Sequence, residues 1–143
     1  MDIAKSLSHK AKQNVSSTPV FFDLQNVSDR QKLEKFLRNK HIQYVSDDYE
    51  EQLREYFAIM NPTLVFDPAF HDTFGEYKKL LESKHPLWQH GKWVYFPWLS
   101  TVVHILDKKE FQHVRTARNR NLINEKEQEK FYNATIGIAG LSV

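Results

Sequence analysis

The 143-residue sequence contains no cysteine, no long apolar run and no large excess of charge of either sign. Without cysteine the chain cannot form disulfides, use a thiolate nucleophile or bind a metal through sulfur, and this composition suits a reducing cytoplasm. No apolar run approaches the roughly 20 residues that a membrane-spanning helix needs, and the N-terminal residues lack the apolar core of a signal peptide. We therefore expect a cytoplasmic protein with no membrane partner.

The charge balance disfavours nucleic acid as a partner. A formal net charge of +2 is small for a nucleic-acid-binding domain, because such domains carry a concentrated basic face. Ten phenylalanines, six tyrosines and three tryptophans supply enough apolar surface for a folded core rather than a disordered chain. The length allows one domain with a core, or one domain and the opening of a second.

The chain also lacks the familiar catalytic motifs. It has no nucleophile elbow and no GxxxxGK phosphate-binding loop. Seven histidines are present, but the spacing of His85 and His90 around a proline and a glycine is not that of a metal site, so no metal is expected. We interpret His104, within the apolar run VVHIL, as a partly buried residue with a satisfied hydrogen bond.

Hydrophobic periodicity predicts an α/β (or α+β) fold: a small mixed sheet with helices, then an arginine-bearing helix and the first strand of a Rossmann-like domain. Strands are expected at residues 20–24, 42–45, 63–66 and 93–98, with helices at 29–39, from 47 to Pro62, around Phe74, Tyr77, Leu80 and Leu81, at 99–106, and from Asp107 onward. Three N-cap pairs support these helix starts: Ser28 with Gln31, Asp107 with Glu110, and Asn124 with Glu127. The first two strands flank a helix, which predicts that they are parallel.

Two side-chain clusters allow a functional and a structural interpretation. Trp88, Trp93 and Trp98 recur every five residues, which fits neither a helix face nor a strand face; core packing and loop pinning are favoured over an aromatic ligand platform. Four acidic residues begin the second helix, and capping of the helix dipole explains them without a bound cation. These four residues are Asp47, Asp48, Glu50 and Glu51.

The C-terminal 29 residues carry the strongest functional pattern. Arg115, Arg118 and Arg120 lie within six positions, and a helix would place the first two on one face. Guanidinium groups bind phosphate oxygens in a bidentate manner and stay charged at any relevant pH, although arginines also neutralise helix C-termini. A capped helix follows, and then an apolar strand, 135–140, that ends at Gly140.

This order of residues resembles the start of the ThiF-type, ubiquitin-activating-enzyme-like adenylyltransferases. Their pattern is R-x-x-R-Q, then Q-x-x-L-x-x-A-x-V-x-V-x-G, leading into a glycine-rich loop. The positions that match it are Arg115, Arg118, Gln128, Phe131, Ala134, Ile136, Ile138 and Gly140. Asn119 stands where the family has glutamine, and Ser142 where it has a second loop glycine; the match covers about a fifth of the chain.

The resemblance implies a function for the parent protein. In the family the second arginine reaches the ATP phosphates in the partner protomer's site, which makes Arg118 a catalytic arginine finger. Arg115, Arg120, Gly140 and Ser142 would then contribute to ATP binding, with Mg²⁺ as the accompanying ion. The implied partners are a second copy in a homodimer and a protein or ubiquitin-like substrate, whose carboxyl terminus is adenylated.

The implied organisation has three parts: a flexible leader at 1–18, an α/β N-terminal extension at 19–114 of a kind found in bacterial ThiF-type proteins, and an incomplete nucleotide-binding domain at 115–143. The chain by itself is expected to be inactive and to bind no cofactor, because phosphate binding needs a complete loop and the following helix. Two alternatives remain open. Residues 19–114 form an interaction module with an aromatic surface at 85–98, or the chain is an unrelated small α/β transferase.

Overall fold

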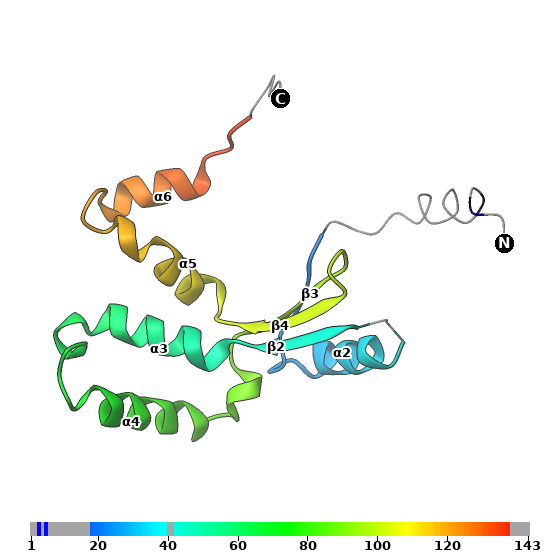
Figure 1. The fold of residues 1–143 in the computed structure, drawn as a ribbon, viewed down its shortest axis with the longest axis horizontal. Helices are drawn as coiled ribbons and strands as arrows, with labels where there is room; N and C mark the ends of the chain where they lie inside the picture. Colours follow the sequence, from blue (N-terminus) through cyan, green and yellow to red (C-terminus); the bar gives the residue numbers. More distant parts are fainter. Residues whose placement is uncertain (1–2, 4, 6–17, 40–41, 138–143) are drawn as a thin grey trace.

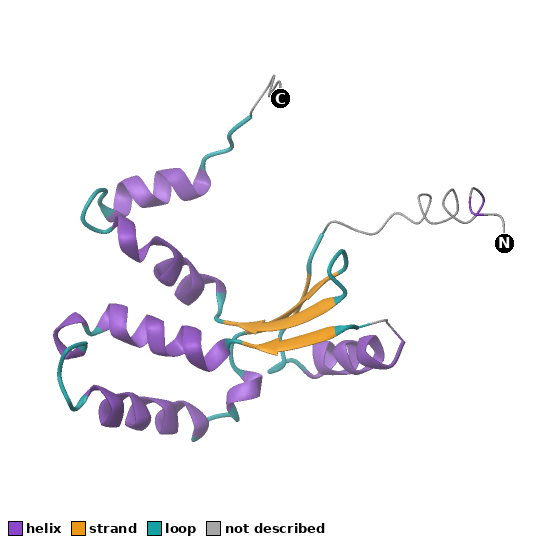
Figure 2. Ribbon diagram, in the orientation of Figure 1, coloured by secondary structure: helices purple, strands orange, loops and turns teal. Residues whose placement is uncertain are grey.

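The structure is a computed structural model, and it describes residues 3, 5, 18–39 and 42–137. Within these ranges the chain has an α/β fold with five α-helices, three short 3₁₀ helices and a four-stranded mixed sheet (Figures 1 and 2). In chain order the elements are β1 (Val20–Phe22), α2 (Val27–Asn39), β2 (Tyr44–Asp47), α3 (Tyr49–Met60), η1 (Pro62–Leu64), α4 (Phe70–Glu82), η2 (Leu87–Gln89), β3 (Lys92–Phe96), β4 (Thr101–Ile105), α5 (Lys108–Thr116), η3 (Ala117–Asn119) and α6 (Glu125–Asn133).

The sheet has the strand order β1-β3-β4-β2. The hairpin of β3 and β4 lies in the middle, antiparallel to β1 on one side and parallel to β2 on the other. The strands β1 and β2 therefore run in the same direction, as predicted, but the hairpin separates them. One row of register partners crosses all four strands and includes Phe22, Trp93, His104 and Asp47.

The helix α2 covers one part of the sheet and encloses the first core. Phe22 of β1 and Tyr95 of β3 are buried there. The Phe36 ring of α2 lies between them in edge-on contacts, with ring centroids 5.5 Å from Phe22 and 4.8 Å from Tyr95. This cluster, which we call the sheet core, also contains Leu24, Leu33 of α2 and Val102 of β4.

A second core lies beyond the carboxyl ends of β2 and β4, where α3, α4 and α5 gather (Figure 1). Leu53 and Phe57 of α3 are buried, as the helical periodicity predicted. Phe57 contacts the rings of Phe70 and Phe74 on α4, each at a centroid distance of 5.7 Å. The helix α5 also packs against α3. Since this cluster is formed mainly by helices, we call it the helical core.

An ion network at one end of the sheet joins β1 and β3 to the start of α5. The ammonium group of Lys92 lies 2.6 Å from Asp23 after β1 and 3.1 Å from Asp107 before α5. The hydrogen bond from Lys92 holds the pKa of Asp23 below its ordinary value, against the opposing effect of partial burial. Burial disfavours the charge of Lys92, but hydrogen bonds to Asp23 and Asp107 raise its pKa overall.

Two predicted elements are wrong. Residues 63–66 are not a strand: η1 and a turn occupy this stretch, and Phe66 is 96% exposed. The run lies between Pro62 and Pro68, which favour turns. Residues 99–106 are not a helix, since Thr101–Ile105 form β4; their β-branched side chains favour a strand, and pairing with both β3 and β2 stabilises it.

The helix caps follow the predictions in part. Asn26, not Ser28, caps α2, because Asn26 Oδ1 accepts the N–H of Ser28 at 2.9 Å. Asp107 precedes α5, but its side chain makes no cap hydrogen bond and instead pairs with Lys92. The capping box of Asn124 and Glu127 is confirmed.

The predicted C-terminal strand lies only partly within the described residues. Residues 134–137 belong to neither a helix nor a strand, and positions 138–143 lie outside the described residues. The helix α5 crosses position 115, where the sequence predicts the start of the nucleotide-binding domain. Across the described ranges, no helix is long and apolar enough to cross a membrane.

Candidate functional site

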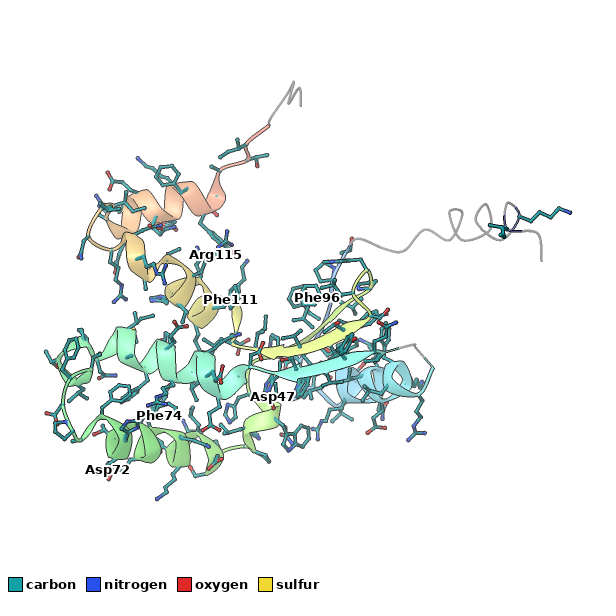
Figure 3. The ribbon with its side chains drawn as sticks, in the orientation of Figure 1. Asp47, Asp72, Phe74, Phe96, Phe111 and Arg115 are labelled. Atoms are coloured by element: carbon teal, nitrogen blue, oxygen red, sulfur yellow. The ribbon has the colours of Figure 1, made fainter. Side chains whose placement is uncertain are left out.

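The predicted arginine region forms a helical hairpin that extends from the helical core. After α5 the chain turns through η3 and returns as α6 (Figures 1 and 3). All residues of α6 are exposed except Gln128, which is half-buried. A groove of about 930 Å³ lies between the two helices.

The two walls of this groove carry opposite charges. Lys108 and Lys109 of α5, and Arg120 after η3, contribute cations to one wall. Glu125 and Glu129 of α6 contribute carboxylates to the other wall. Within the described residues no ion pair joins the two walls, although the ammonium group of Lys108 lies 5.3 Å from the centroid of the Tyr132 ring.

The three predicted arginines have different environments. Arg115 lies in the last turn of α5 (Figure 3) and Arg118 in η3, so they do not share one continuous α-helix. Both are exposed, and neither guanidinium group makes a hydrogen bond or ion pair with any described residue. Arg120 instead donates a hydrogen bond to the carbonyl oxygen of Ile59 on α3, at 3.1 Å. Two free guanidinium groups therefore lie beside the hairpin turn.

The other residues of the family pattern are less closely grouped. Gln128 and Asn119 both line the groove. Phe131 is 65% exposed and is not among the groove-lining residues. Gly140 and Ser142 lie outside the described residues, so the structure does not place the predicted phosphate-binding loop.

The acidic cluster is held by protein contacts. Asp48 accepts a hydrogen bond from the Ser46 hydroxyl, and Glu50 pairs with Lys78 of α4. Asp47 accepts hydrogen bonds from the Tyr49 N–H and from His104. Among the described residues, no group of three or more histidine, aspartate or glutamate side chains could hold a metal ion.

The aromatic segment at 85–98 is divided between core and surface. Trp93 packs against the sheet core, and its indole N–H donates to the carbonyl oxygen of Trp88. Trp88 and Trp98 remain about half exposed. Packing and loop pinning therefore describe Trp93, while an interaction surface around the other two tryptophans stays a prediction.

Sequence reasoning missed a second groove, of about 580 Å³, between α3 and the loop before α4. Arg54 lies in it, 3.1 Å from a ring nitrogen of His71. The exposed Phe66 borders the same groove. The sequence signal for this groove was the pair of prolines at 62 and 68, because prolines favour turns. Apolar residues in a turn between them have no neighbouring strand to cover them.

Glu110 of α5 is a partly buried carboxyl. Burial raises its pKa, and the nearby negative charge of Asp107 adds to this effect. Burial likewise raises the pKa of Tyr77 on α4, with a further contribution from Glu110. Glu110 lines neither of the two grooves described above.

Comparison with known proteins gives one informative match. No protein family and no solved structure matches the chain. The chain is 33% identical over 98 residues to a Mycobacterium tuberculosis protein named "Uncharacterized protein MT1398". The match covers 67% of this chain and 14% of the relative. The chain thus resembles a small part of a longer protein whose name states no activity.

Proposed function

We propose that this chain is the N-terminal region of an ATP-dependent, ThiF-type adenylyltransferase, and that Arg118 acts on ATP in a partner protomer. The chain itself serves a structural, partner-binding or dimerisation role in the cytoplasm. The observation that carries the proposal is the exposure of two unpaired guanidinium groups, Arg115 and Arg118, at the hairpin turn.

The guanidinium groups of Arg115 and Arg118 have no hydrogen-bond or ion-pair partner among the described residues, which supports a role in the active site of a second protomer. An arginine that enters another protomer's site must be accessible and must not be neutralised by its own chain. Lys78 and Lys92 are held by carboxylates, and Arg120 by a carbonyl oxygen. Arg115 and Arg118 are free of such contacts among the described residues, so they can meet phosphate oxygens without first breaking an ion pair.

The proposed reaction is adenylation of a carboxylate, such as the C-terminus of a protein or a ubiquitin-like substrate. A carboxylate oxygen attacks the α-phosphorus of ATP, an acyl-phosphate bond forms, and pyrophosphate leaves with the electron pair of the broken P–O bond. Arg118 would stabilise the charge that develops on the phosphate oxygens, and Arg115 would add a second contact. Mg²⁺ would accompany the ATP phosphates in this reaction.

The test is pyrophosphate exchange by the longer protein that the proposal requires. With ATP, substrate and labelled pyrophosphate, Arg118→Ala is expected to lower the exchange rate by roughly 10²–10³-fold. This is the usual effect of removing one hydrogen-bond donor that stabilises negative charge in the transition state. Arg115→Ala should have a smaller effect.

Arg38 provides the matched control. It is an exposed arginine in the last turn of α2. Figure 1 shows α2 at the opposite end of the sheet from the α5–α6 hairpin. Arg38→Ala should leave exchange unchanged. An Arg118→Ala protein that exchanges pyrophosphate at the wild-type rate would contradict the arginine-finger role.

A further inference from the structure

His104 lies between the two cores, in a cluster that the proposed function does not use. It is 1% exposed, and it is the one buried polar residue among those described. Its register partners are Asp47 on β2 and Trp93 on β3, so the three side chains lie on the same face of the sheet. The sequence prediction of a satisfied hydrogen bond is confirmed, and both ring nitrogens take part.

Both ring nitrogens of His104 face oxygen atoms. Nδ1 lies 2.7 Å from a carboxylate oxygen of Asp47, and Nε2 lies 2.7 Å from the carbonyl oxygen of His90. An ionised carboxylate oxygen and a carbonyl oxygen can only accept hydrogen bonds. A neutral imidazole has one N–H, whereas this site accepts two.

Two aromatic rings enclose the imidazole. Trp93 stacks on one face at a centroid distance of 4.4 Å and an interplanar angle of 4°, and Tyr49 on the other face at 4.6 Å and 12°. Aromatic faces attract a cation, most strongly when water is excluded. Because burial raises the pKa of Tyr49, its hydroxyl stays neutral and adds no negative charge.

The same stack joins the two cores. Tyr49 belongs to the helical core, and Trp93 packs against the sheet core. Asp47 strengthens this junction, because the oxygen that faces His104 also accepts the N–H of Tyr49 at the start of α3, at 3.3 Å. A change in the charge of His104 therefore acts on the contact between α3 and the sheet.

We propose that His104 is an imidazolium in the folded protein, and that this buried cation is a pH-sensitive clamp between the sheet core and the helical core. Loss of one ring proton leaves a nitrogen lone pair facing an acceptor oxygen. The repulsion would loosen α3 from the sheet, and with it α5 and the arginine hairpin.

The charged and titratable surroundings agree with this assignment. Asp47 of β2 is the charged group that contacts the ring. Tyr49 faces it from α3, and His90 contributes its carbonyl from the loop before β3. The His90 ring lies 6.4 Å from that of Tyr49, and Glu110 of α5 acts on Tyr49 from the helical core. Lys92 does not share the row of register partners to which His104 belongs.

The direction of the pH effect follows from proton linkage. An exposed histidine in the unfolded chain loses its proton above a pH of about 6.5. If the folded chain keeps the proton there, the folded state binds more protons and stability falls as the pH rises. The unfolding equilibrium constant should then increase by up to about tenfold per pH unit, the limit for one proton.

The experiment compares urea unfolding of the full chain in weakly acidic and weakly alkaline buffers. The wild-type midpoint should move to lower urea as the pH rises. Asp47→Asn should remove this dependence, because its amide can donate to Nδ1 of a neutral ring whose Nε2–H still donates to His90. Asp48→Asn is the matched control, since Asp48 binds Ser46 and not His104, and it should keep the wild-type dependence.

A direct measurement covers the case in which Asp47→Asn fails to fold. In wild-type protein labelled with ¹⁵N-histidine, both ring nitrogens of His104 should show the chemical shifts of protonated nitrogen near neutral pH. An unprotonated shift at either nitrogen would overturn the proposal, and so would an Asp47→Asn protein with an undiminished pH dependence.

Discussion

At the scale of single residues, the junction between the cores depends on a glycine that no motif singles out. Gly91 has φ of +63°, a conformation that residues with a side chain rarely adopt. A Cβ at this position would lie 2.2 Å from the carbonyl oxygen of Ile105 and 2.7 Å from the ring of Tyr49. Because Gly91 has no side chain, the loop can place the carbonyl oxygen of His90 against the His104 ring.

We expect Gly91→Ala to lower the free energy of unfolding by roughly 2–4 kcal/mol, since a strained φ and a steric clash with backbone both contribute. Urea unfolding followed by circular dichroism measures this change. Gly75→Ala provides the contrast: Gly75 lies inside α4 with nothing within 4 Å of a Cβ. Alanine there should stabilise the protein by about 0.5–1 kcal/mol. Equal effects of the two substitutions would refute this account.

The residue scale also shows why the sequence predicted some contacts and not others. The apolar run around His104 indicated burial and a satisfied hydrogen bond. Its partners could not be predicted, because Asp47 and His90 lie 57 and 14 residues away and meet it only through strand register and the turn at Gly91. Similarly, Asp47 belonged to an acidic cluster that helix capping explained without reference to the sheet.

At the scale of elements, local periodicity predicted α2, α3 and α4 well, because each buries one face with regular spacing. It was wrong at 99–106, where Thr101–Ile105 form β4. The side chains of Val102, Val103 and His104 lie alternately on the core face and the opposite face of the sheet, and these faces exist only once β3 is paired with β4. A short apolar run does not distinguish a buried strand from a helix. The turn between β3 and β4 ends at Ser100, which has φ of 49°. Its sequence contains no Asn-Gly, Asp-Gly or similar pair that usually marks a β-hairpin turn.

The helix α6 has little tertiary support, so its stability depends on its cap. Asn124 accepts the N–H of Glu127 at 3.0 Å, and Glu127 accepts the N–H of Asn124 at 2.8 Å. Asn124→Ala should cost about 1 kcal/mol of helix stability and increase hydrogen exchange of the α6 amides. Asn124→Ser should restore protection, because serine also caps. Unchanged exchange in Asn124→Ala would mean that packing, not the cap, holds α6.

At the scale of the whole molecule, the Lys92 network links β1, β3 and α5. The pKa of Asp23 is lowered by its hydrogen bond from Lys92, so the contribution of Asp23 to stability is present above the ordinary carboxyl pKa. It is lost as the pH falls through the lower pKa of the folded state. The network should therefore weaken in acid, opposite in sign to the proposed effect of His104.

Lys92→Met should lower the free energy of unfolding near neutral pH by about 1 kcal/mol, since the pairs are partly exposed. It should also make the loss of stability in acid shallower. Acid titrations of the urea midpoint for both proteins measure these effects. Lys32→Met is the control, because Lys32 forms a local pair with Asp29 within α2, and it should change stability little. If stability still falls steeply in acid in Lys92→Met, carboxyl groups other than Asp23 and Asp107 cause the acid dependence.

The central position of the β3–β4 hairpin has a consequence for synthesis on the ribosome. The two edge strands, at 20–22 and 44–47, are made long before their partners at 92–96 and 101–105. Pairing at such sequence separations is slow, because a long loop must close before any strand contact forms. The emerging chain therefore holds two unpaired strands and three helices until residue 105 leaves the exit tunnel. The sheet can assemble only then, so chains that stop before the hairpin should be substrates for chaperones and proteases.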